Sequence, residues 1–83
     1  MDKIELGTHA KMIISNKAYN IIFEKVREKY LVAWSQTGSH QTELRETIYN
    51  TVVALTDVKK EIESLAVAGD NEIFKKEQED LNG

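Results

Sequence analysis

The chain has 83 residues, with 11 Lys and Arg against 14 Asp and Glu and a formal net charge of −3. It has no cysteine, which excludes a disulfide framework and a thiolate metal site. No stretch approaches the roughly 20 apolar residues that span a bilayer, and the opening residues contain no apolar run long enough for a signal peptide. We therefore expect a protein that does not use a membrane and is not secreted by a signal peptide.

The first long segment without proline or glycine runs from about residue 8 to residue 36. Its apolar residues are spaced by threes and fours, which predicts one face of a helix. Ser15 and Asn16 favour helix N-caps over helix interiors, so we expect a kink there, with a short N-terminal helix before it. The apolar face consists of Tyr19, Ile22, Phe23, Val26, Tyr30, Ala33 and Trp34.

Residues 37–41 interrupt the apolar spacing and predict a short turn between two helices. Trp34 is expected to be a core residue that caps the end of this hairpin. A second helical pattern follows over about residues 41–68. Gly69 suits a left-handed helix stop, and Asp70 or Asn71 a new N-cap. The second pattern consists of Leu44, Ile48, Val52, Leu55, Val58, Ile62 and Leu65.

The predicted fold class is all-α, in one domain over residues 1–83. An antiparallel helical hairpin, about 16–36 and 41–68, carries short helices at each end, and residues 70–83 form a loosely held tail. In a chain this short, the burial of apolar surface barely offsets the conformational entropy that is lost on folding. We therefore expect the hairpin to self-associate into a bundle.

No residue pattern predicts catalysis or a bound cofactor. His9 and His40 lie on different elements with no further ligand at helical spacing, so we expect no metal site. The carboxylate pairs at helical spacing, such as Glu43 with Glu46, are expected on solvated faces without the shifted pKa that acid–base catalysis needs. The four glycines form no phosphate-binding or nucleophile motif. We expect a protein that is not an enzyme.

A series of short landmarks follows the chain in a fixed order: Gly7 and Ala10, Ile13 to Asn16, Trp34 and Thr37, Arg45 and Glu46, and Gly69. The order of these landmarks resembles a group of small helical bacteriophage proteins encoded near virion-assembly and packaging genes. The resemblance spans about residues 5–75, and Lys17 stands where such proteins often have proline. It implies a small phage accessory protein that works in the host cytoplasm or in the virion.

Three functional interpretations remain open. The preferred one is a virion-assembly or packaging component that binds itself, as a homodimer, and another protein of the phage or host through the apolar residues Ile14, Ile21, Tyr49 and Val53. The first alternative is an inhibitor that binds a host enzyme through the acidic residues Asp57, Glu61 and Glu63. The second is a nucleic-acid binder that uses Lys11, Lys17, Lys25, Arg27 and Lys29, although no basic stripe is evident.

Overall fold

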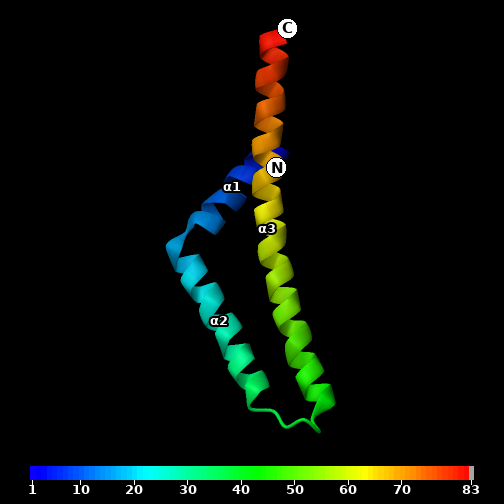
Figure 1. Cartoon of the computed structure of the whole chain (residues 1–83). Coiled ribbons are helices and arrows are strands. Elements are labelled where there is room, and N and C mark those ends of the chain that lie inside the picture. Colours follow the sequence, from blue (N-terminus) through cyan, green and yellow to red (C-terminus); the bar gives the residue numbers. More distant parts are fainter. Residues whose placement is uncertain (83) are drawn as a thin grey trace.

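The computed structural model describes residues 1–82 and contains three helices and no strand within that range (Figure 1). Helix α1 spans Lys3–Ser15, α2 spans Lys17–Ser35 and α3 spans Thr42–Asn82. The all-α fold class is therefore confirmed. From α2 the chain turns at residues 36–41, and α3 runs back in the opposite direction (Figure 1).

The predicted kink at Ser15 and Asn16 is confirmed. Asn16 has extended backbone angles, φ −76° and ψ 118°, and its side-chain oxygen accepts a hydrogen bond of 2.8 Å from the backbone N–H of Tyr19. Asn16 therefore ends α1 and caps the N-terminus of α2. The Asn20 side chain donates to the carbonyl oxygen of Ile14 at 2.8 Å, which satisfies one of the free carbonyl groups at the end of α1.

The turn between α2 and α3 is fixed by local side-chain hydrogen bonds. Thr37 Oγ1 donates to the carbonyl oxygen of Trp34 at 2.6 Å, and the backbone N–H of Thr37 donates to the same oxygen at 3.1 Å. Gln41 Oε1 accepts from the backbone N–H of Gly38 at 2.7 Å. The predicted position of this turn, residues 37–41, is confirmed.

The predicted helix stop at Gly69 is wrong. Helix α3 continues through Gly69 to Asn82, and none of the described glycines has a positive φ. Gly69 is buried where α1 crosses α3, so it serves close helix packing instead of a left-handed cap. The expected short C-terminal helix is a continuation of α3 that projects past this crossing (Figure 1). The predicted tail also included residue 83, which lies outside the described residues.

The chain is long and thin, with extents of 65 × 24 × 17 Å and a radius of gyration of 18.4 Å. A compact chain of this length would have a radius of gyration of about 12 Å. Helix α1 packs on α3 more extensively than α2 does. Among the described residues, the only buried hydrophobic side chains are those of Ala10 and Ala66. The molecule therefore has almost no core of large side chains.

Candidate interaction surface

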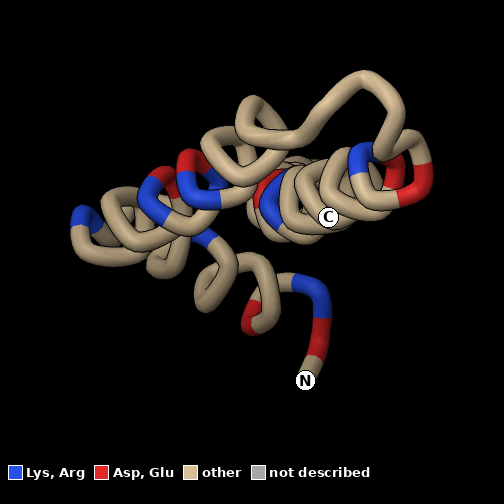
Figure 2. The backbone as a smooth tube through the Cα atoms, turned by 90° about the horizontal axis from the view of Figure 1, so that it is seen from below, with Lys and Arg blue, Asp and Glu red and all other residues tan. Residues whose placement is uncertain are grey.

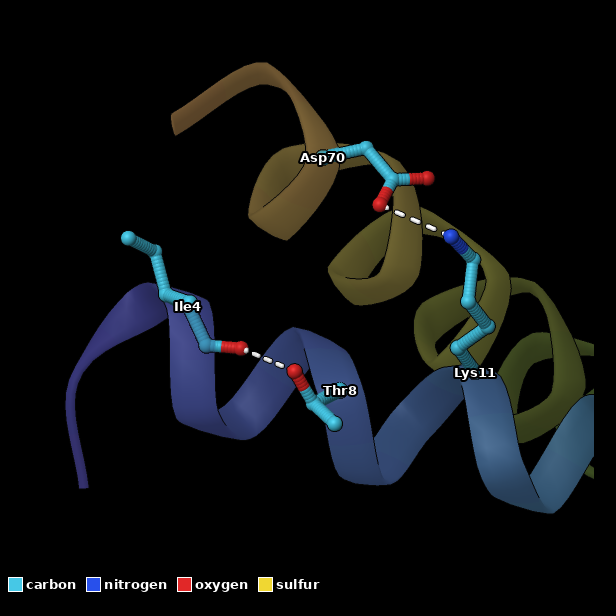
Figure 3. A network of polar contacts seen from close by, with 4 residues as sticks. All are labelled: Ile4, Thr8, Lys11 and Asp70. Atoms are coloured by element: carbon cyan, nitrogen blue, oxygen red, sulfur yellow. Dashed lines mark hydrogen bonds and ion pairs between the residues drawn. The ribbon is translucent and has the colours of Figure 1, made fainter. Parts of the chain in front are cut away.

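Four small residues hold α1 against α3. Gly7 and Ala10 in α1 and Ala66 and Gly69 in α3 are all buried, and each pair is three residues apart on its helix. A Cβ atom built on Gly7 would lie only 2.7 Å from the Cα of Gly69, so the two backbones touch. Beside this contact Lys11 Nζ lies 2.9 Å from an Asp70 carboxylate oxygen, and both side chains are about half exposed (Figure 3). This crossing fixes which sides of α3 remain uncovered.

At the other end of the molecule, Arg45 links α3 to the end of α2. Its guanidinium lies 3.9 Å from the centroid of the Trp34 ring, in the geometry of a cation–π contact. Its Nη1 also donates to Thr37 Oγ1 at 2.9 Å. The Trp34 side chain is 38% exposed, so the interpretation of Trp34 as a core residue is wrong. It lies at the edge of an open surface.

A pocket of about 380 Å³ opens beside Trp34, between α2 and the first half of α3. Helix α2 supplies one wall and α3 the other, and the walls are mainly aliphatic and aromatic. Such a lining favours an apolar side chain over a polar substrate, since few polar groups converge on it. The pocket is lined by Arg27, Leu31, Trp34, Ile48, Tyr49 and Val52.

The four predicted interface residues do not form one patch. Tyr49 and Val53 are exposed and lie one turn apart on α3, and Tyr49 lines the pocket. Ile21 is exposed on α2 and Ile14 is half-buried on α1, and neither lines the pocket. The prediction missed Leu31, although its spacing of four and three residues from Arg27 and Trp34 marks a second row on α2.

The three predicted acidic residues are exposed, but they do not share one face of α3. Asp57 and Glu61 are one turn apart, whereas Glu63 lies about 200° further round the helix from Glu61. Within residues 1–82 none of the three takes part in an ion pair; the ion pairs are Lys11–Asp70 and Glu24–Arg27. The acidic alternative is thus limited to the pair formed by Asp57 and Glu61.

Basic positions are interspersed with acidic ones. Figure 2 shows Lys and Arg segments next to Asp and Glu segments along the chain, and Arg27 is itself paired with Glu24 at 3.5 Å. Among residues 1–82 no group of three His, Cys, Asp or Glu side chains is placed to hold a metal ion. In the same range no helix has the length and apolar character needed to cross a membrane.

Many large apolar side chains are exposed alongside the charged ones, among them Leu31, Tyr49 and Phe74. Comparisons with protein-family models, with curated proteins and with solved structures each give no match to this chain.

Proposed function

We propose that this protein is a non-enzymatic interaction module whose apolar surface binds a second copy of the chain and a partner protein. The observation that supports this is the exposed area. The accessible surface is 6464 Å², whereas a compact monomer of 9.5 kDa exposes about 5,000 Å². The excess, about 1,400 Å², exceeds the roughly 800 Å² that each partner buries in a standard protein–protein interface.

In the functional state α2 and the first half of α3 act as an antiparallel hairpin within a larger helical bundle. A bundle supplies the apolar neighbours that Leu31, Tyr49 and Val53 lack in the single chain, where all three are exposed. We further propose that the module serves virion assembly or packaging in a bacteriophage, in the host cytoplasm or in the particle. That role is implied by the resemblance of the landmarks from Gly7 to Gly69 to those of small helical bacteriophage proteins.

Light scattering on the purified protein across a range of concentrations tests self-association. We expect a mass of at least two chains at micromolar concentration. Tyr49→Ser with Val53→Ser should lower this mass toward one chain while far-ultraviolet circular dichroism stays helical, because both side chains are exposed and stabilise the monomer little. A monomer at high micromolar concentration would contradict self-association.

Affinity capture from phage-infected cells tests the second partner and separates assembly from inhibition. The bait proteins are the wild type, the Tyr49/Val53 variant and a matched charge variant, Asp57→Lys with Glu61→Lys. We expect a phage structural protein that the apolar variant loses and the charge variant retains, since apolar anchors supply most of the energy of stable interfaces. Recovery of a host enzyme that only the charge variant loses would instead establish the inhibitor.

A further inference from the structure

We propose that two copies of the chain pair through antiparallel α3 helices, so that Phe74 of each copy enters the pocket beside Tyr49 of the other. This inference rests on the self-association proposed above and specifies its geometry. It starts from the exposed apolar residues of α3 that lie outside the contact of α1 with Ala66 and Gly69. Among them, Val67, Phe74 and Leu81 recur every seven positions.

Two interleaved rows, each with a period of seven residues, run along α3 beside this contact. The first row contains Val53, Val67, Phe74 and Leu81, with Lys60 in the remaining position. In this row Val67 is 59% exposed, Phe74 60% and Leu81 79%. The second row begins at Tyr49, which is 62% exposed, and continues through Thr56, Glu63, Asp70 and Glu77. Left-handed coiled coils repeat apolar residues every seven positions in both rows; here the first row is mainly apolar and the second is mainly polar.

The charges in the two rows favour an antiparallel partner. A parallel pair in register would place Lys60 against Lys60, Glu63 against Glu63 and Asp70 against Asp70 of the second copy. Such like-charge layers oppose association. In an antiparallel pair, residues of the first row face residues of the second row instead, and opposite charges can meet.

One antiparallel register, with its two-fold axis between residues 61 and 62, brings the exposed aromatic residues of the two α3 helices together. It places Tyr49 opposite Phe74 of the second copy and Lys60 opposite Glu63 of the second copy, and symmetry repeats each layer. A shift by one heptad separates the two aromatic residues and places Glu63 against Val67 or Val53. The chosen register therefore pairs Tyr49 with Phe74 and Lys60 with Glu63, and it also places Glu46 opposite Glu77.

The pocket supplies an independent reason for this register. Phe74 lies on the part of α3 that projects past α1, and its exposed ring has no aromatic neighbour within residues 1–82. In the antiparallel dimer this projecting segment reaches the turn end of the second copy, where Leu31 and Trp34 flank Tyr49. Burial of aromatic rings together contributes strongly to interfaces. The projecting end of α3 in each copy thus supplies an aromatic side chain that fits the pocket of the other copy.

Two kinds of layer oppose this register: Glu77 lies opposite Glu46 of the second copy, and Asp70 lies opposite Val53 of the second copy. The carboxylate of Asp70 is already paired with Lys11 at 2.9 Å (Figure 3). Its charge is thus partly compensated before the second helix approaches. The two kinds of unfavourable layer weaken the interface without excluding it.

Disulfide cross-linking tests the register, since the natural chain has no cysteine. Thr56→Cys and Val67→Cys are made as separate variants, mixed and oxidised with glutathione disulfide. The register places positions 56 and 67 in one layer, so the mixture should yield a cross-linked dimer that contains one chain of each. Each variant alone should stay uncross-linked, because its two thiols lie about 16 Å apart and a disulfide requires Cα atoms within about 7 Å.

Charge exchange gives a second readout that preserves the apolar residues. Lys60→Glu and Glu63→Lys should each weaken the dimer by about tenfold, because each places like charges in two symmetric layers. An equimolar mixture of the two variants should recover wild-type association. The control is Lys76→Glu, the same substitution on the opposite side of α3, which should leave the dissociation constant unchanged.

The outcomes separate the register from self-association itself. A wild-type dimer by light scattering with cross-links in the single variants would establish a parallel pair and overturn this inference. A dimer with no cross-link in any sample would overturn the register and leave self-association intact. A monomer would overturn both, and the capture experiment would then decide the binding of a partner protein.

Discussion

Replacing Gly69 with alanine tests the closeness of the crossing between α1 and α3. A Cβ atom on Gly69 would lie 2.8 Å from the Cα of Gly7 and 3.1 Å from the carbonyl oxygen of Lys3. Both are backbone atoms, so rotation of a side chain cannot relieve the clash. The two helices themselves must separate by several tenths of an ångström to admit the methyl group.

Two opposing terms determine the change in the free energy of unfolding. Overpacking a tight contact costs about 1–3 kcal/mol, whereas alanine is favoured over glycine inside a helix by about 1 kcal/mol. We therefore expect Gly69→Ala to lower the free energy of unfolding by about 1 kcal/mol. Ala54→Gly, at an exposed position of α3, measures the propensity term alone and should also lower it by about 1 kcal/mol.

Urea unfolding followed by far-ultraviolet circular dichroism, at one fixed protein concentration, measures both variants. If the crossing were looser in solution, only propensity would act, and Gly69→Ala would raise the free energy of unfolding by about 1 kcal/mol. That result would refute the reasoning. Adding Gly7→Ala to Gly69→Ala should cost less than the sum of the single effects, because both methyl groups require the same separation of the helices.

Substitutions at three further positions test local contacts, each by the same urea unfolding. Asn16→Ala removes the N-cap of α2 and should cost about 1 kcal/mol, and Asn16→Asp, which keeps an acceptor, should restore most of it. Arg45→Ala removes both the contact with the Trp34 ring and the hydrogen bond into the turn; it should cost about 1–2 kcal/mol and shift the Trp34 fluorescence. Lys11→Ala breaks an exposed ion pair with Asp70 and should cost less than about 1 kcal/mol, with the difference vanishing at high salt.

Local signals predicted the helix boundaries where the structural cause is itself local. The cap of Asn16 reaches only Tyr19, and the turn bonds of Thr37 and Gln41 span three residues. The predicted stop at Gly69 is wrong because the role of this residue depends on its contact with Gly7, far away along the chain. A glycine near the end of an apolar pattern usually marks a stop, and only the helix crossing shows otherwise.

The candidate surface was predictable in its chemistry but not in its layout. Periodicity identified Tyr49 and Val53 as apolar residues outside the main stripe, and both are exposed. It could not show that Trp34 and Leu31 border the same pocket, because that depends on how α2 leans against α3. Helix geometry alone separates Glu63 from Asp57 and Glu61, so that grouping could have been rejected from the sequence.

The placement of small and large residues links the fold to the proposed association. The contact between α1 and α3 buries glycine and alanine, which allows the backbones to touch but removes little apolar area from water. The large side chains of Tyr49, Val67 and Phe74 lie outside that contact. A monomeric domain normally has the opposite arrangement, with its large apolar residues inside. The crossing thus sets the direction of α3 relative to α1 and leaves most of the large apolar side chains exposed. In the proposed dimer a second helix would bury several of them.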